Sequence, residues 1–269
     1  MKDLRKYNTD NIYKKDEYRL LSETDVERII CSIFNHLLPM YNEENNVIGT
    51  AQALLDCLRK ADIDFEIILS DDGSTDATAE KAASIAANNP EIRLIRYETN
   101  HGKGYSVRLG MLESLGEYAI FTDCDLAYGT DVILDVLSEL RASDADICIG
   151  SRAIHPSGYS DYPWMRRLFS ETYIKILKRH AGFVYSDSQC GIKGFSRAAA
   201  NAIFSKCVID GFAFDLEALI LADKLGFKIK EHPVRVLSHV SKASKVHMFR
   251  DAFKMLRDVK VIKRTHAQR

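Results

Sequence analysis

The sequence lacks the signatures of several large protein classes. No run of apolar residues approaches the roughly 20 that a membrane-spanning helix needs. The first 27 residues are polar and charged, and they do not have the apolar core of a signal peptide. The 37 basic and 38 acidic residues balance, so the chain has no overall attraction to nucleic acid. We therefore expect a cytoplasmic protein, for which any contact with a membrane would be peripheral.

Paired cysteines and two common nucleotide-binding motifs are also missing. The six cysteines are scattered with no Cys-x-x-Cys pair, which favours buried, reduced thiols over disulfides or a zinc site. The chain has no GxxxxGKS/T loop and no GxGxxG after its first predicted strand. These absences argue against a P-loop nucleoside triphosphatase and against a Rossmann dehydrogenase.

What is present is a regular alternation of predicted strands and helices. The 269 residues, 46% of them hydrophobic, suffice for one large α/β domain. The predicted strands are 29–38, 65–69, 92–97, 118–122, 146–150, 191–196 and 227–237. The predicted helices are 44–61, 77–87, 131–140, 162–181, 212–225 and 245–263, and residues 102–114 are predicted to form a loop that leads into a helix. Such alternation with short connections predicts a mainly parallel sheet flanked by helices.

We divide the chain into an N-terminal extension (1–27), one α/β domain (28–240) and a basic, amphipathic C-terminal helix (241–269). In that helix apolar residues recur at helical spacing, while lysines and arginines occupy much of the remaining surface. A basic amphipathic helix can lie on an anionic membrane. The alternative, which we favour slightly, is that the apolar stripe packs on the protein core.

The most informative motif is Asp123-Cys124-Asp125, which follows an apolar predicted strand. Open α/β sheets bind their ligands beyond the carboxyl ends of the strands. In an extended chain Asp123 and Asp125 would point the same way, because side chains alternate with period two. Two hard oxygen ligands suit Mg²⁺ or Mn²⁺, whose remaining ligands are usually water and substrate phosphates. The bland alternative is that the two aspartates only cap the following helix.

Three further segments lie at predicted strand ends or before a helix. The first strand should stop at Pro39, and Asn42 is a candidate cap for the next helix. Asp71 and Asp72 open a polar turn, where carboxylates can bind a ribose or simply form the turn. The glycine-flanked Lys103 precedes a helix, whose first turn favours anions.

Together these segments resemble family 2 glycosyltransferases, which have the GT-A fold. The matching motifs are Pro39-Met40-Tyr41-Asn42-Glu43-Glu44, Asp71-Asp72-Gly73-Ser74-Thr75-Asp76, Gly102-Lys103-Gly104 and Asp123-Cys124-Asp125. The resemblance covers residues 29 to 240 and makes 28–150 the nucleotide-sugar half and 151–240 the acceptor half. It implies a Rossmann-like α/β domain and an inverting hexosyltransferase.

The resemblance also assigns roles to individual residues. The base and ribose of a UDP- or GDP-hexose are expected against Pro39, Tyr41, Glu43, Asp71 and Asp72. Lys103 is expected near the base or phosphates, and Gly104 and Cys124 belong to the same donor-binding segments. Asp125, helped by Asp123, is expected to hold Mg²⁺ or Mn²⁺ on the diphosphate.

Three segments of the second half resemble the polyprenyl-phosphate hexosyltransferases, a branch that includes dolichyl-phosphate glucosyl- and mannosyltransferases. These segments are Gly150-Ser151-Arg152, Asp187-Ser188-Gln189-Cys190-Gly191-Ile192-Lys193 and Phe214-Asp215-Leu216-Glu217. The second of them looks closer to the glucosyltransferases, so UDP-glucose is preferred over GDP-mannose. The candidates for holding the acceptor phosphate are Arg152, Arg166, Arg167, Ser170, Gln189, Arg235 and Lys245.

Two other functions stay open. A soluble or polysaccharide hydroxyl as acceptor would require a general base, for which Asp215 is the best candidate. A protein that binds nucleotide sugars without turning them over is the other alternative, against which the intact Asp123 and Asp125 argue. In the preferred reading Asp125 and Arg152 act in catalysis, while Asp215 orients a neighbouring arginine.

Overall fold

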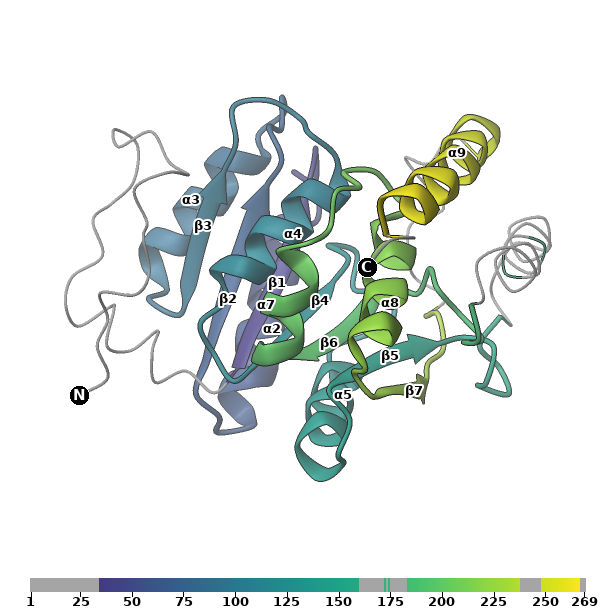
Figure 1. The fold of residues 1–269 in the computed structure, drawn as a ribbon. Helices are drawn as coiled ribbons and strands as arrows, with labels where there is room; N and C mark the ends of the chain where they lie inside the picture. Colours follow the sequence, from purple (N-terminus) through teal and green to yellow (C-terminus); the bar gives the residue numbers. More distant parts are fainter. Residues whose placement is uncertain (1–33, 160–171, 173, 175–182, 238–247, 267–269) are drawn as a thin grey trace, which may run out of the picture.

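The computed structural model describes residues 34–159, 172, 174, 183–237 and 248–266, and Figure 1 shows their arrangement. The strands are β1 (Phe34–Met40), β2 (Phe65–Asp71), β3 (Ile92–Arg96), β4 (Tyr118–Thr122), β5 (Ile147–Ser151), β6 (Ile192–Ser196) and β7 (Ile229–Pro233). The helices are α2 (Val47–Lys60), α3 (Thr78–Asn88), α4 (Lys103–Glu113), α5 (Asp131–Ala142), α7 (Arg197–Phe204), α8 (Phe214–Leu225) and α9 (Met248–His266).

The strands of the described residues form one sheet in the order β3-β2-β1-β4-β6-β5-β7. Strand β6 runs antiparallel to β4 and β5, and the other pairings are parallel. The predicted mainly parallel α/β sheet is therefore confirmed. Because β6 is reversed, its first residue, Ile192, pairs with Thr122 at the carboxyl end of β4. The segment before β6 thus reaches the same edge as the ends of β1, β2 and β4.

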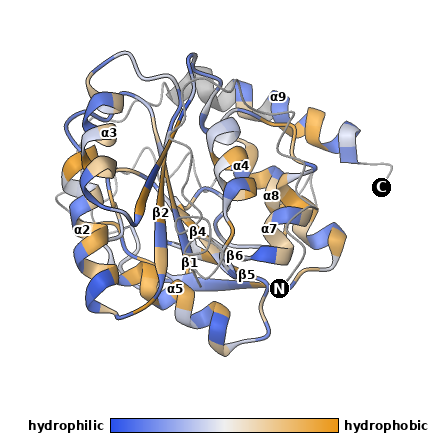
Figure 2. Ribbon diagram, turned by 90° about the vertical axis from the view of Figure 1, so that its left-hand side faces the viewer, coloured by the Kyte–Doolittle hydropathy of each residue, from blue (hydrophilic) through white to orange (hydrophobic). Residues whose placement is uncertain are grey.

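Helices cover both faces of the sheet, and each face has its own apolar core. Strand side chains alternate between the two: Leu38 and Ile67 belong to one core, and their neighbours Leu37 and Ile68 to the other. Figure 2 shows the sheet between the two helical layers. Helices α2, α3 and α5 supply the first core, while α4, α7, α8 and α9 supply the second.

The strand order reverses between β1 and β4, which makes the crevice beyond their carboxyl ends the expected ligand site. Strand β1 leads through α2 to β2 on one side, and β4 lies on its other side. Thr50 of α2 donates to the Cys124 carbonyl at 2.6 Å and so ties this helix to the loop after β4. The fold therefore places the Asp123–Asp125 loop at the switch point.

The structure corrects the prediction that Pro39 stops the first strand. Strand β1 continues to Met40, and Pro39 pairs with Ser70 of β2. On the other side the ladder with β4 extends only to Leu37. Proline is tolerated here because one side of the strand is unpaired at this position. Pro39 itself is buried.

Asn42 does not cap the next helix, which begins at Val47 with Asn46 in the capping position. Instead Asn42, with a positive φ of 54°, accepts the Thr75 N–H at 2.9 Å. Its own N–H donates to Ser74 Oγ at 2.8 Å. Asn42 therefore joins two loops at the switch edge, a role that sequence spacing did not indicate.

Other boundaries differ more modestly. Helix α7 was not predicted, although Ser196 caps it by accepting the Ala199 N–H at 3.3 Å. Strand β7 is shorter than the predicted 227–237. The proposed extension 1–27 lies outside the described residues, and so does the predicted helix 162–181 apart from residues 172 and 174, which are helical. None of the helices in the described ranges is long and apolar enough to cross a membrane.

Strand β1 buries two polar side chains completely, Asn35 and His36. Asn35 donates to Glu66 at 2.7 Å and accepts the Gly116 N–H. His36 Nε2 lies 3.0 Å from Thr122 Oγ1, directly before Asp123. Burial lowers the pKa of His36 from 6.5 to about 3, so the ring is neutral near pH 7. A neutral imidazole therefore contacts the residue from which the Asp123–Asp125 loop begins.

This burial predicts a pH dependence of stability. The unfolded chain binds a proton at His36 below pH 6.5, whereas the folded chain does not until about pH 3, so the unfolding free energy falls as pH drops between these values. The contribution reaches ~1.4 kcal/mol per pH unit. In His36→Gln, which keeps an amide for Thr122, urea unfolding should show a shallower pH dependence. Equal slopes for the two proteins would contradict this assignment.

Candidate active site

Two loops that lead into helices interlock at the carboxyl ends of β1 and β2. Besides the Asn42 contacts, the Glu43 N–H donates to Thr78 Oγ1 at 2.6 Å, and the Glu44 N–H donates to Asp76 Oδ2 at 3.3 Å. Asp76 Oδ1 also accepts the Thr78 N–H at 3.0 Å, in the first turn of α3. These contacts fix the polar segments that the sequence assigned to a nucleotide.

Asp71 is a fully buried carboxylate in need of a donor. No hydrogen bond of normal geometry reaches either of its oxygens within the described residues, and Arg96 Nε is 3.7 Å away. Burial raises the pKa of Asp71, against the effect of Ser74 and Arg96. A buried carboxylate without a firm partner is costly unless a ligand supplies a donor. Asp71 is therefore suited to accept an N–H group, such as that of a base.

Asp72 has a different role, because its carboxylate accepts hydrogen bonds from donors of the protein itself. It accepts the N–H groups of His101 at 3.0 Å and Gly102 at 2.7 Å, and the Asn100 amide at 2.9 Å. Gly102 has a φ of 113°, and a Cβ there would meet the Asp210 carbonyl oxygen at 2.4 Å. Asp72 thus shapes the loop that presents Lys103.

Lys103 stands at the start of α4 and forms an ion pair with Asp123, at the end of β4. Its ammonium also lies 5.9 Å from the centre of the Phe214 ring. Burial alone would lower the pKa of Lys103, but the charges of Asp123 and Asp215 raise it above its usual value. The lysine is therefore cationic and faces two of the predicted site carboxylates.

Asp125 is the more accessible carboxylate of the pair. Its Oδ1 accepts the Ala127 N–H at 3.1 Å, and Leu126 between them has a positive φ of 46°. Partial desolvation and then the charge of Asp123 raise the pKa of Asp125, and Glu43 adds to this rise. The three predicted residues Glu43, Asp123 and Asp125 are therefore within electrostatic reach of one another.

The segment before β6 closes the site from the other half of the chain. Gly191 lies against Asp123, so closely that a Cβ at Gly191 would meet Asp123 Oδ2 at 2.3 Å. The Gly191 N–H also points to the Tyr128 hydroxyl, at 3.5 Å. Only a residue without a side chain fits at this point. The Gly191 position was part of a quoted motif, but its contact with Asp123 was not predicted.

A buried ion pair joins Lys193 of β6 to Asp215 of α8. Lys193 is fully buried, with its Nζ 2.7 Å from Asp215 Oδ1 and 2.6 Å from the Cys190 carbonyl oxygen. The same ammonium lies 5.7 Å from the centre of the Phe121 ring. Burial raises the pKa of Asp215, and the charges of Lys193 and Lys103 oppose this rise. Lys193 was not among the predicted site residues.

Arg152 follows β5 and is bound in a bidentate pair. Its Nε and Nη2 lie 2.7 Å and 2.9 Å from the two oxygens of Asp187. Burial would raise the pKa of Asp187, but Arg152 holds it below its usual value. The guanidinium is only 5% exposed. A phosphate at Arg152 would therefore have to share this guanidinium with Asp187.

For the remaining predicted residues the structure gives fewer contacts with the rest of the candidate site. Tyr41 is exposed near the edge of β1, Cys124 is buried, Gly104 packs against the Ile209 carbonyl, and Arg235 is exposed beyond β7. The Gln189 N–H donates to Asp187 at 3.0 Å. The proposed acceptor residues Arg166, Arg167, Ser170 and Lys245 lie outside the described residues.

A second carboxylate of α8, Glu217, supports the site from behind. It is fully buried and accepts the N–H groups of Val208 at 3.0 Å and Ile209 at 2.8 Å. His266 Nε2, near the end of α9, lies 2.8 Å from the same carboxylate. Asp210, which follows Ile209 in the chain, accepts the Gly104 N–H at 2.8 Å through its carbonyl oxygen. Glu217 therefore links α9 to the loop that seats Lys103.

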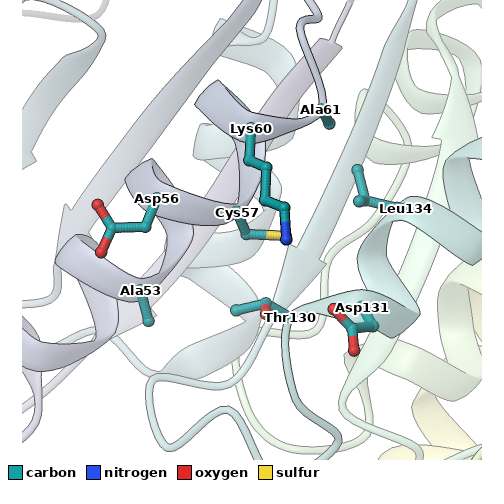
Figure 3. Close-up of a pocket in the computed structure, with 8 residues that line it drawn as sticks. All are labelled: Ala53, Asp56, Cys57, Lys60, Ala61, Thr130, Asp131 and Leu134. Atoms are coloured by element: carbon teal, nitrogen blue, oxygen red, sulfur yellow. The ribbon is translucent and has the colours of Figure 1, made fainter.

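The structure also has an open hollow between α2 and α5, drawn in Figure 3. Eight residues line it, namely Ala53, Asp56, Cys57, Lys60, Ala61, Thr130, Asp131 and Leu134. None of these is a predicted site residue. The lining lacks a buried charged group of the kind seen at Lys193 or Arg152. We therefore place the active site at the switch point and not in this hollow.

Comparison with known proteins identifies the family. The sequence model of the family described as glycosyl transferase family 2 matches residues 37–204, which include the Lys103–Asp123 pair and Lys193. The fold and the match define this protein as a glycosyltransferase with a GT-A-like α/β domain. The chain belongs to glycosyl transferase family 2. The resemblance that the sequence motifs indicated is confirmed at this level.

Relatives with assigned names extend the match over most of the chain. The dolichyl-phosphate beta-glucosyltransferase of Saccharomyces cerevisiae is 30% identical over 257 residues, which covers 89% of this chain and 75% of that protein. The enzyme of the same name from Dictyostelium discoideum is 30% identical over 250 residues, with coverages of 88% and 75%.

Solved structures show the same fold at lower identity. Glucosyl-3-phosphoglycerate synthase from Mycobacterium tuberculosis, in a complex with Mn²⁺, UDP and glucosyl-3-phosphoglycerate, superposes with a TM-score of 0.64. It is 17% identical, and the match covers 93% of this chain and 86% of that one. This likeness establishes the architecture, while the chemistry has to be argued from the residues of this chain.

The buried pair predicts an asymmetric mutational response. In Lys193→Met the Asp215 carboxylate would lose its buried partner, which should lower the unfolding free energy by about 3 kcal/mol. In the double variant Lys193→Met/Asp215→Asn no charge is left uncompensated, so much of this loss should be recovered. Urea unfolding of both variants and of Asp215→Asn completes the cycle. Additive effects of the two changes would show that the residues are not coupled.

Proposed function

We propose that this glycosyltransferase moves glucose from UDP-glucose to a polyprenyl phosphate of the dolichyl type, with inversion at the anomeric carbon. The names of the relatives that match 89% and 88% of the chain support glucose and a dolichyl phosphate. The UDP complexes of structures with the same fold support the nucleotide. GDP-mannose is the donor against which this preference must be tested.

The observation that carries the choice of acceptor is the ion pair between Lys193 and Asp215. Asp215 is 5% exposed, and its Oδ1 lies 2.7 Å from the Lys193 ammonium. A carboxylate held in this way is a poor base, because taking up a proton would break a buried pair. A phosphate acceptor is already an anion at neutral pH and needs no base. What such an acceptor requires is position and charge neutralisation.

The nucleotide half supplies the donor contacts. Asp71 offers a buried acceptor for a base N–H, while Tyr41 and Glu43 border the same edge. Lys103 lies within reach of the charges of Asp123 and Asp215, so its ammonium can stabilise negative charge that develops on the leaving diphosphate. Asp72 acts through the loop that it holds and does not need to touch the donor.

The residues present also suit a divalent cation, Mg²⁺ or Mn²⁺. Burial and the nearby charge of Asp123 raise the pKa of Asp125, so the two carboxylates are neighbours that can offer hard oxygen donors. No group of three acid, histidine or cysteine ligands forms a metal cage in the described part of the chain. A cation held by one or two carboxylates takes its other ligands from water and substrate phosphates. Asp125, aided by Asp123, would hold it, and when bound it would supply Lewis-acid stabilisation of the leaving group.

The acceptor phosphate is proposed to bind beside the second half of the chain. Arg152 lies at the end of β5 and shares its guanidinium with Asp187, so this pair can shape the edge and offer its remaining donors. Gln189 and Arg235 are additional candidates on the described surface. The cations of the predicted helix 162–181 and Lys245 complete the proposed set.

A second candidate is a hydroxyl acceptor with Asp215 as the general base. Burial raises the pKa of Asp215, which is the direction that a base working near neutral pH requires. The variant Asp215→Asn separates the two candidates. With a phosphate acceptor, turnover should fall modestly because only the partner of Lys193 is altered. A complete loss with normal donor binding would favour the hydroxyl acceptor.

The proposed function predicts a specific transfer reaction. With Mn²⁺ and a polyprenyl phosphate in detergent, label from UDP-glucose should enter the lipid phase, and label from GDP-mannose should enter far less. Asp125→Ala should lower this transfer by roughly a hundred-fold, because electrostatic stabilisation of the leaving group is lost. Chelation of the metal should have a similar effect.

Asp131→Ala is the matched control, since Asp131 is an exposed acid at the start of α5 that follows the same loop. This variant should transfer glucose at nearly the normal rate. Equal loss in Asp125→Ala and Asp131→Ala would indicate a general structural effect. Donor hydrolysis without lipid labelling in the unaltered protein would contradict the proposed acceptor.

A further inference from the structure

The C-terminal part of helix α9 packs against the protein through the buried side chains that the structure describes there. Val259 and Ile262 are buried in the core that also contains residues of α8, and His266 contacts Glu217. These three residues recur at spacings of three and four, so they mark one side of the helix. Of the predicted apolar stripe, Val259 is the member whose side chain the structure describes, and it packs on the core.

The opposite side of α9 is strongly basic. The exposed charged side chains that the structure describes on this helix are all cations, and we call them the basic face: Lys254, Arg257, Lys260, Lys263 and Arg264. Asp258 is half-buried, and this burial raises its pKa against the charges of the nearby Lys254 and Arg257. Lys260, Lys263 and Arg264 form no ion pair within the described residues. The chain as a whole has a net charge of only −1, so this concentration is local.

The basic face begins beside the active site. The side chain of Lys254 is so near Gly211 that a Cβ there would meet it at 3.4 Å. The preceding residue, Asp210, accepts the Gly104 N–H next to Lys103. Glu217 joins the far end of α9 to the same loop. Figure 1 shows α9 at the periphery of the molecule, beyond α8.

We propose that the basic face of α9 docks this protein on the surface of an anionic membrane. The proposal rests on the proposed function, because a polyprenyl-phosphate acceptor is embedded in a bilayer. Contact is electrostatic, through the exposed cations on the side of α9 away from the buried Val259 and Ile262. Docking through α9 keeps the Lys103 loop, to which this helix is linked, near the plane of the lipid phosphates.

Charge complementarity favours an anionic membrane as the partner of the basic face. Among the side chains that the structure describes, the basic face has five exposed cations and the half-buried Asp258 as its one acid. A sheet of anionic headgroups neutralises such an array without any specific fit. A protein partner would be expected to use exposed apolar side chains as well, and Val261 is the one exposed large hydrophobic residue on the described part of α9. Nucleic acid is the other polyanion, and it serves as the competing outcome.

The test is co-sedimentation of the full chain with vesicles. Vesicles of phosphatidylcholine and phosphatidylglycerol in equal parts should bind the protein, and vesicles of phosphatidylcholine alone should not. The variant Lys260→Gln/Lys263→Gln/Arg264→Gln should bind the anionic vesicles roughly a hundred-fold more weakly. High salt should release the unaltered protein, since these charges are exposed to solvent.

The control variant removes three exposed cations elsewhere: Lys60→Gln/Arg141→Gln/Lys228→Gln. It has the same net charge as the α9 variant and should bind vesicles like the unaltered protein. If both variants bound the vesicles equally weakly, net charge and not the basic face would explain binding, which would overturn the proposal. Binding to a DNA duplex with no binding to anionic vesicles would also overturn it.

Transfer assays separate this proposal from the proposed function. In detergent, the α9 variant should transfer glucose to the polyprenyl phosphate like the unaltered protein, because the active site is unchanged. With the acceptor embedded in anionic vesicles, its rate should fall in step with binding. If no protein labels the lipid under any condition, the proposed function fails, while vesicle binding still decides the docking surface. Unchanged transfer by the α9 variant in vesicles would overturn the docking proposal.

Discussion

The ion pair between Lys103 and Asp123 is the interaction on which the rest of the site depends. It connects the first turn of α4 to the carboxyl end of β4, at the point where the strand order reverses. Asp72 shapes the loop before Lys103, and Gly191 leaves room for Asp123. The charges of Lys103 and Asp123 therefore compensate each other, while Asp125 is the more exposed of the two aspartates.

The second half of the chain contains several buried charges. The Lys193–Asp215 and Arg152–Asp187 pairs and the Glu217 carboxylate are almost fully enclosed, and each connects segments far apart in the chain. Burying ions costs free energy that their attraction only partly offsets, so such pairs are weak sources of stability. Their value here is geometric, because they fix β6, α8 and the loop around residue 209 around one edge of the sheet.

Strand ends carried most of the information that the sequence offered. The segments with Lys103 and with Asp123 and Asp125 were predicted on the same side of the sheet, because parallel strands bring their carboxyl ends to one edge. The structure joins them through the Lys103–Asp123 ion pair. Lys193 was missed because a lysine inside an apolar strand reads as an outward-facing residue, and its partner Asp215 is distant in sequence. Pro39 was misread for a related reason. Proline removes a hydrogen-bond donor, but only the arrangement of neighbouring strands shows whether that donor is needed.

The most direct test of this account is the calorimetric titration of UDP into the protein, with Mn²⁺ or with a chelator, for the unaltered chain and for Asp125→Ala. The account predicts clear binding with Mn²⁺, much weaker binding with the chelator, and little gain from Mn²⁺ in the variant. Binding that is independent of both Mn²⁺ and Asp125 would contradict the claim that this sheet edge holds a metal-bound nucleoside diphosphate.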